Sequence, residues 1–87
     1  MTPDAIRETV RRVLHSIAPE ADLDSLAPGA DLRAELDLDS MDFLRFITGL
    51  HAELGVEVPE ADYRKLGSLD GCVSYLSARS APRRAES

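Results

Sequence analysis

Three segments of the chain repeat apolar residues at the spacing of an amphipathic helix, and this pattern limits the fold more than any other feature. The segments cover residues 3–17, 40–54 and 68–78. Side chains three and four residues apart share one face of a helix, so each segment predicts a helix with one buried face. Residues 56–59 alternate like a strand but have no visible pairing partner, so they predict an extended link. With a short helical turn over residues 61–66, the sequence predicts an all-α fold, a small antiparallel bundle of three main helices plus one short helix.

Residues at the ends of these segments agree with the predicted helices. Thr2 followed by Pro3 predicts an N-cap and a proline at the first helical position, and Pro19 marks the end of the first helix. Gly55 fits the left-handed position after the second helix, and Ser68 predicts the N-cap of the last one. Local signals therefore bound all three main helices.

The second helix follows a long connection without helical periodicity. Its predicted buried stripe, flanked by two aromatic residues, consists of Met41, Leu44, Ile47, Leu50 and Leu54, with Phe43 and Phe46 beside it. Residues 18–39 predict a long loop between the first and second helices, held to the core by its leucines. A structureless connection of about 20 residues is uncommon in a compact domain and indicates either function or a mistaken assignment.

Chain length and charge exclude several classes of function. The 87 residues have room for one small domain, which we place at residues 1–78, followed by a disordered tail at 79–87. Sixteen acidic residues against ten basic ones give a net charge of −6, and residues 1–76 alone hold 15 acids and 7 bases, a net of −8. This charge has the wrong sign for nucleic acid or an anionic membrane surface. We expect basic patches on protein partners instead.

Cysteine usage and hydropathy predict a cytoplasmic protein. Cys72 is the only cysteine, so the chain can form neither an internal disulfide nor a cysteine pair for a metal. Residues 1–10 contain Asp4 and Glu8 where a signal peptide would need an apolar core. No apolar run approaches the length of a membrane span, about 18 residues. We expect neither export nor membrane anchoring.

The acidic connection does not fit a calcium-binding loop. A loop that began at Asp24 would have Gly29 and Glu35 in the required places. However, Leu26 and Pro28 would then occupy two ligand positions, where calcium needs oxygen donors. We therefore predict no metal site.

The candidate catalytic side chains have no partners nearby in the sequence. His15 and His51 have no plausible nucleophile as a neighbour. Cys72 falls on the apolar face of the last helix, which favours a small core residue over a reactive thiol. We therefore predict no catalytic residue and no enzymatic activity of the chain's own.

The most distinctive motif is Asp39-Ser40-Met41 at the start of the second helix. Taken alone, Ser40 has an ordinary explanation as an N-cap whose oxygen accepts a backbone N–H. Asp39 and Asp42 likewise stabilise the positive end of the helix dipole with or without a function. The tripeptide by itself does not specify what the protein does.

In its context, however, the motif resembles that of the acyl carrier protein family. An amphipathic helix, a long loop, the tripeptide, a helix that ends before Gly55 and a final helix follow in the family's order over roughly residues 4–78. The resemblance implies that Ser40 carries 4′-phosphopantetheine as a covalent cofactor. A holo-synthase, the phosphopantetheinyl transferase, would transfer it from coenzyme A with magnesium. The thiol of this arm would then hold acyl groups as thioesters.

The resemblance also implies roles for the neighbours of the motif serine. Asp39 matches the acid before the serine and is expected to orient the modifying complex and its metal, and Met41 matches an apolar partner contact. We expect three further residues to belong to the same motif and partner surface, namely Asp42, Phe43 and Arg45. Phe43, like Phe46, also fits simple core packing.

Two departures from the family pattern indicate a specialised carrier. Leu38 stands where typical members have glycine before the Asp-Ser pair, which predicts reduced backbone freedom. The second helix has Arg45, His51 and Ala52 where fatty-acid carriers have glutamates, so its charge is nearly neutral. We expect its partners to rely more on apolar contact and less on long-range electrostatic steering.

Three functions remain open from the sequence. The first is a free-standing, monomeric carrier that moves acyl groups from a loading ligase to the downstream synthases or transferases of a dedicated fatty acid or polyketide pathway. The second is an aminoacyl or peptidyl carrier loaded by an adenylate-forming ligase. The third is an unmodified acidic interaction module, which would function without a modified Ser40.

Overall fold

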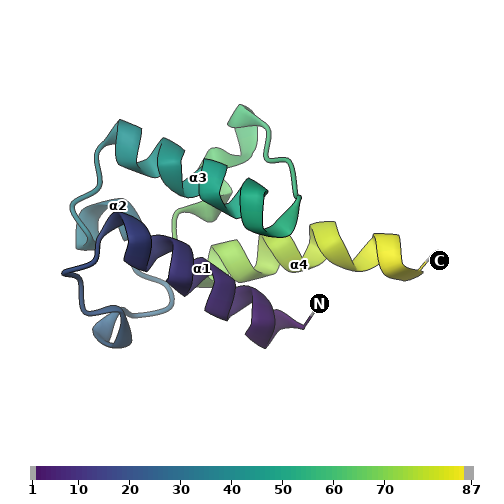
Figure 1. Cartoon of the computed structure of the whole chain (residues 1–87), viewed down its shortest axis with the longest axis horizontal. Helices are drawn as coiled ribbons and strands as arrows, with labels where there is room; N and C mark the ends of the chain where they lie inside the picture. The colour runs from purple at the N-terminus through teal and green to yellow at the C-terminus, as the bar shows by residue number, and fades with distance from the viewer. Residues whose placement is uncertain (1, 86–87) are drawn as a thin grey trace.

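Three long helices pack together, and three short helical segments connect them (Figure 1). The computed structural model describes residues 2–85, with side chains described as far as Arg79. The long helices are α1 (Pro3–Ile17), α3 (Ser40–Leu54) and α4 (Leu69–Ala85). The short segments are η1 (Leu23–Ser25), α2 (Leu32–Glu35) and η2 (Glu60–Leu66). Residues 2–85 contain no strand, which confirms the predicted all-α class.

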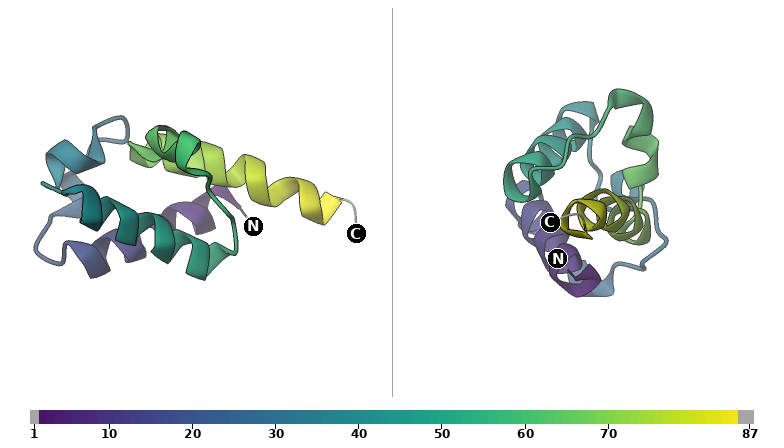
Figure 2. Two further views of the ribbon diagram at one scale, coloured as in Figure 1. Left: turned by 90° about the horizontal axis from the view of Figure 1, so that it is seen from above. Right: turned by 90° about the vertical axis from the view of Figure 1, so that its right-hand side faces the viewer.

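The helix directions bring the two ends of the long connection to one end of the bundle. α1 runs opposite to both α3 and α4 and packs against each of them (Figures 1 and 2). The connection that contains α2 lies where α1 ends and α3 begins (Figure 1). The segment η2 packs on α4. The Asp39-Ser40-Met41 motif therefore lies at an end of the bundle, where α3 begins.

Local capping sets the helix ends, as predicted. The Thr2 hydroxyl accepts a hydrogen bond from the Ala5 N–H at 3.1 Å, and the Ser68 hydroxyl accepts one from the Gly71 N–H at 3.0 Å. Gly55 has a φ of 69°, the left-handed conformation that glycine adopts without steric penalty. The bounds of α1 and α3 coincide with the predicted ranges.

The core lies between the three long helices. Its largest fully buried side chains come from these helices and from two of the connections: Ile6, Val10, Leu14, Leu32, Phe46, Leu50, Leu66, Cys72 and Leu76. Gly49 lets α1 and α3 approach closely, since a Cβ at this position would lie 2.7 Å from Cγ1 of Val13. Each large apolar side chain contributes about 1.5–3 kcal/mol when it is fully buried. Apolar packing therefore holds the helices that position the Asp39-Ser40-Met41 motif.

The buried side of α3 agrees only in part with the predicted one, since Ile47 and Leu50 are buried as predicted. The buried residues of this helix are Phe43, Phe46, Ile47 and Leu50. Met41 and Leu44, predicted to lie in the buried stripe, are 61% and 43% exposed. Both sets repeat at helical spacing, so the sequence pattern alone could not separate them. The helix is rotated so that its two aromatic rings, which bury the most apolar area, enter the core.

The long connection contains more structure than predicted. η1 and α2 form within it, and Leu32 of α2 is fully buried. The Leu32 N–H donates to the Gly67 carbonyl at 2.7 Å, and the Asp70 N–H donates to the Pro28 carbonyl at 2.9 Å. The prediction of a structureless loop was therefore wrong, because backbone hydrogen bonds join this connection to the start of α4. The short helix predicted at 61–66 is the 3₁₀ helix η2, which begins at Glu60.

The last helix is longer than its apolar pattern predicted. Its periodicity ends near residue 78, whereas α4 continues to Ala85. Part of the tail predicted to be disordered lies outside the described residues, namely the side chains from residue 80 onward and all of residues 86–87. The division into a domain at 1–78 and a tail at 79–87 stays a prediction.

Candidate functional site

Asp39, not Ser40, caps α3. The Asp39 carboxylate accepts a hydrogen bond from the Asp42 N–H at 2.8 Å, and the Asp42 carboxylate accepts one from the Asp39 N–H at 3.4 Å. This reciprocal pair is a capping box, which satisfies two backbone donors that the helix itself leaves unpaired. The prediction of Ser40 as a possible N-cap was therefore wrong. Ser40 is the first residue of the helix, and its hydroxyl is not needed to cap it.

The Ser40 side chain is exposed beside a guanidinium group. Arg33, from α2, donates from Nη2 to Oγ of Ser40 across 3.4 Å, a long hydrogen bond. The same guanidinium lies over the Phe43 ring, with Cζ 5.8 Å from the ring centroid. No local pattern in the sequence pointed to Arg33, because it lies seven residues before the serine in a segment predicted to be a loop. Only the fold of α2 brings it to the site.

The backbone enters α3 through an unusual conformation. Asp37 has a φ of 56°, in the left-handed region that aspartate visits more readily than most residues. Leu38 was predicted to reduce backbone freedom here, but the left-handed residue is its neighbour. Leu38 is 7% exposed, and its N–H donates to the Arg33 carbonyl at 2.9 Å. The segment before the motif is therefore held in place by a buried leucine and a backbone hydrogen bond.

The other predicted site residues separate into exposed and buried ones. Met41 and Arg45 are exposed on the first turns of α3, and Nη1 of Arg45 lies 3.8 Å from the Asp42 carboxylate. Phe43, predicted as part of the partner surface, is only 8% exposed and belongs to the core. Core packing, which the sequence also allowed, is thus what the structure shows for Phe43. The partner roles of Met41 and Arg45 stay predictions.

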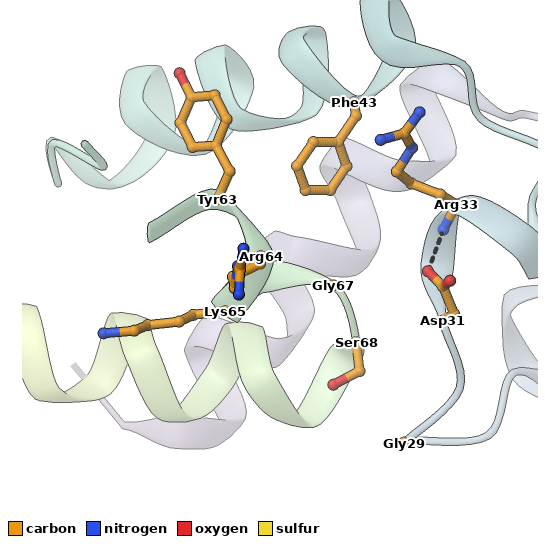
Figure 3. A pocket seen from close by; sticks show the side chains of 9 residues that line it. All are labelled: Gly29, Asp31, Arg33, Phe43, Tyr63, Arg64, Lys65, Gly67 and Ser68. Carbon is orange, nitrogen blue, oxygen red and sulfur yellow. Dashed lines mark hydrogen bonds between the residues drawn. The ribbon is translucent and has the colours of Figure 1, made fainter. Parts of the chain in front are cut away.

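A groove lies next to the motif, between α3, η2 and the connection around α2. Figure 3 shows the Phe43 ring directed into this groove, with Tyr63 and Arg33 on either side of it. The groove has a volume of about 620 Å³. The Phe43 and Tyr63 ring centroids are 6.3 Å apart in an edge-to-face arrangement. An aromatic wall therefore begins within one helical turn of Ser40.

Other candidate reactive groups are occupied by structural contacts. Burial raises the pKa of the Cys72 thiol to about 12, and Sγ donates to the Leu66 carbonyl at 3.3 Å. Nδ1 of His51 lies 3.2 Å from the carbonyl oxygen of Val56. Among the described residues, no three His, Cys, Asp or Glu side chains gather as metal ligands would. No helix within residues 2–85 has the length and hydropathy to span a membrane.

Comparison with known proteins identifies the family. The family described as the phosphopantetheine attachment site matches residues 4–76. The chain belongs to the acyl carrier protein family. The acyl carrier protein of Lactobacillus acidophilus is 34% identical to it over 59 residues, which cover 68% of this chain and 74% of that one. The acyl carrier protein of Zymomonas mobilis is 29% identical over 58 residues, which cover 67% of this chain and 74% of that one.

The fold agrees with that of a solved acyl carrier protein. The structure of the protein from Enterococcus faecalis superposes with a TM-score of 0.79 and covers 92% of this chain and 100% of that chain. The two sequences are 21% identical. The helical arrangement is therefore that of an acyl carrier protein.

The cofactor of this family is covalently attached 4′-phosphopantetheine, and the residues at the start of α3 fit such a group. A phosphodiester needs an accessible hydroxyl, and the Ser40 side chain is exposed and free of a capping role. A helix N-terminus favours negative charge through its unpaired N–H groups and its dipole. The Arg33 guanidinium adds a cation next to the hydroxyl. When bound, the arm supplies a thiol that forms thioesters.

Proposed function

We propose that Ser40 is the residue that carries the arm, and that this chain moves acyl groups between enzymes without catalysing a reaction itself. One observation supports this assignment most directly. In a chain of the acyl carrier protein family, Asp39 and Asp42 complete the cap of α3. They thereby leave the exposed Ser40 hydroxyl available for modification.

The attachment reaction breaks the phosphoanhydride of coenzyme A and forms a phosphate ester at the serine. Oγ of Ser40 would attack the phosphorus of coenzyme A that bears the pantetheine, so that an oxygen–phosphorus bond forms at the serine. The bond between this phosphorus and the oxygen of the nucleotide half breaks, and the nucleotide leaves with that oxygen. The hydroxyl proton passes to a base of the phosphopantetheinyl transferase, which uses magnesium. Arg33 and the N-terminus of α3 would stabilise the phosphodiester that results.

The exposed side of α3 supports a carrier for a dedicated pathway. Met41 and Leu44 are the large apolar side chains described as exposed in this protein, and both lie near Ser40. Between Ser40 and Leu54 the helix has two acids and one arginine, so it has a weak electrostatic field. Partner enzymes would then recognise apolar contacts at short range more than a field at long range. We infer a monomer that works in the cytoplasm and accepts its cargo from a loading ligase.

The experiment is an intact-mass measurement after incubation with coenzyme A, magnesium and a phosphopantetheinyl transferase of broad specificity. We expect the parent protein to gain one phosphopantetheinyl group and Ser40→Ala to gain none. Ser68→Ala is the matched control, since Ser68 also lies at the start of a helix but uses its hydroxyl as a cap. No gain of mass with several transferases would favour an unmodified interaction module. A gain on Ser40→Ala would assign the arm to another residue.

A further inference from the structure

The basic side chains of this acidic protein are not paired equally. Eight lysine and arginine side chains lie within residues 2–79. Six of them lie within ion-pair distance of a carboxylate: Arg7, Arg11, Arg12, Arg45, Lys65 and Arg79. Arg33 and Arg64 have no carboxylate partner in this part of the chain. Because acids outnumber bases, two arginines without such a partner are unexpected if arginine only balances surface charge.

Both of these arginines line the groove beside Ser40. Figure 3 shows Arg33, from α2, beside the Phe43 ring, and Arg64, from η2, below the Phe43 and Tyr63 rings. Lys65 also lines the groove and lies 3.5 Å from the Asp62 carboxylate. Asp31 is the one acid among the lining residues, and its carboxylate accepts a hydrogen bond from the Arg33 N–H at 3.1 Å as the cap of α2. The groove therefore has three cationic side chains and one carboxylate, although the protein as a whole has a net negative charge.

With increasing distance from Ser40, the groove offers first a cationic contact and then an apolar one. Next to the serine lies the Arg33 guanidinium, and the Phe43 and Tyr63 rings follow as an apolar wall. Arg64 is exposed at the same groove. Arginine presents a planar set of donors that matches a carboxylate or a phosphate, and aromatic rings pack against hydrocarbon. A ligand with hydrocarbon in the middle and an anion at its end would satisfy both.

We propose that this groove holds acyl cargo that carries a carboxylate of its own, with its hydrocarbon against Phe43 and Tyr63 and its carboxylate at Arg64. This inference rests on the carrier function proposed above, because the arm at Ser40 is what brings the cargo to the groove. Arg33 then lies at the phosphodiester end of the arm, and Arg64 at the cargo end. The binding is noncovalent, and the acyl group stays on the thiol of the arm.

Two acyl groups that differ only in the terminal carboxylate test this assignment. A phosphopantetheinyl transferase would load the protein from hexanoyl-coenzyme A or from adipoyl-coenzyme A, and the intact mass would confirm each product. The first readout is the set of backbone amide shifts at Gly67 and Ser68, which line the groove. The second is the rate at which hydroxylamine cleaves the thioester. We expect larger shifts for adipoyl than for hexanoyl, and cleavage about threefold slower, as for a solvent-exposed ion pair.

Arg64→Gln is the diagnostic variant, and Arg7→Gln is its matched control. Arg64 makes no ion pair with a described side chain of residues 2–79, and Arg7 is a half-buried arginine of α1 that pairs with Asp4 outside the groove. In Arg64→Gln, we expect the adipoyl-loaded protein to show the same amide shifts and the same cleavage rate as the hexanoyl-loaded protein. In Arg7→Gln, we expect both readouts to stay as in the parent. The melting temperature of each variant checks that the fold is retained.

The outcomes separate this inference from the carrier function. If the arm attaches but adipoyl and hexanoyl behave alike in the parent, the groove does not select a carboxylate, while the carrier function stands. If Arg64→Gln leaves the difference between the two acyl groups unchanged, Arg64 is not the partner of the carboxylate and the assignment is overturned. If no arm attaches to Ser40 at all, the proposed function fails before the groove is tested.

Discussion

Two helices of this protein begin at a serine, and the two serines are used differently. Ser68 uses its hydroxyl to accept the Gly71 N–H and so caps α4. Ser40 stands one residue further into its helix, because Asp39 has taken the capping position of α3. A hydroxyl that caps a helix is engaged by the backbone, whereas the Ser40 hydroxyl is not. The aspartate before the serine therefore makes the serine available.

The largest effect that this comparison predicts comes from exchanging each serine for alanine. Ser40→Ala is expected to abolish attachment of the arm and to change the free energy of unfolding by less than about 0.5 kcal/mol, as for an exposed site with no cap to lose. Ser68→Ala is expected to lower the free energy of unfolding by about 1 kcal/mol, because a cap is lost, and to leave attachment of the arm intact. Urea denaturation and intact mass measure the two properties. Equal losses of stability would contradict the distinction between the serines.

The second prediction concerns the aspartate that replaces Ser40 as the cap. Asp39→Ala removes the acceptor for the Asp42 N–H and should destabilise the protein by about 1 kcal/mol. Asp39→Asn keeps an acceptor oxygen and should lower the free energy of unfolding by less than half as much. Urea denaturation at neutral pH distinguishes the two variants. Similar losses for both would mean that the charge of Asp39, and not its hydrogen bond, stabilises α3.

A smaller effect is expected from the different ways in which the backbone enters the two helices. The chain enters α3 through Asp37, with a φ of 56°, and enters α4 after Gly67, with an ordinary φ of −76°. Asp37→Gly should raise the free energy of unfolding by about 0.5 kcal/mol, because relief of the left-handed strain exceeds the entropy that glycine adds to the unfolded chain.

Asp37→Ala is the matched comparison for this position. Alanine has a Cβ and lacks the polar side chain that helps aspartate adopt a positive φ, so this variant should be less stable than the parent. Thermal unfolding of the three proteins side by side tests the order Gly, Asp, Ala. If glycine proved the least stable of the three, the left-handed strain at Asp37 would be too small to matter.

These contrasts also show how far the sequence could predict the structure. Caps and helix ends depend on residues a few positions apart, so Thr2, Gly55 and Ser68 could be assigned without the fold. The family motif likewise pointed to Ser40, whose role as the attachment residue stays a proposal. The buried side of α3 was assigned correctly at Ile47 and Leu50 but not at Met41 and Leu44, because the rotation of the helix against its neighbours is set by the tertiary packing.

The groove required contacts that no local pattern contains. Arg33 and Arg64 are 31 positions apart in the sequence and belong to two short helices that the periodicity described poorly or not at all. They line one groove because backbone hydrogen bonds such as that from Leu32 to Gly67 join their two segments. Charge composition predicted an acidic surface, and the place of the two arginines within residues 2–79 that lack a carboxylate partner became visible only in three dimensions.

The smallest predicted effect concerns the side chains that join η2 to the middle of α4. The Asp62 carboxylate accepts hydrogen bonds from the Tyr75 hydroxyl at 2.6 Å and from Arg79 at 3.0 Å, whereas the side-chain link between α3 and α1 is the ion pair of Arg12 with Glu53 at 2.9 Å. The hydrogen bond from Tyr75, with smaller contributions from Lys65 and Arg79, lowers the pKa of Asp62 below its ordinary value. Tyr75→Phe should therefore raise that pKa, as measured by NMR titration of the carboxyl carbon.

The sign of the corresponding stability effect follows from the lowered pKa. The stabilisation from Asp62 is fully present above the pKa of the unfolded chain and is lost as the pH falls through the lower value of the folded state. The deficit of Tyr75→Phe should therefore be present at neutral pH and diminish in acid. Unfolding experiments at several pH values measure it, and Thr48→Ala, at an exposed position of α3, is a control. A deficit independent of pH would assign the role of Tyr75 to packing alone.

The burial of Cys72 has a practical consequence for all of these experiments. Thiol reagents react with the thiolate, and a thiol with a pKa of about 12 in the core stays protonated and shielded at the pH at which they are used. The thiol of the arm would have an ordinary pKa near 8.5 and lie at the surface. A maleimide dye would then label the arm selectively in the wild-type sequence. One fluorescence reading could count modified, unloaded molecules, with no cysteine to remove beforehand.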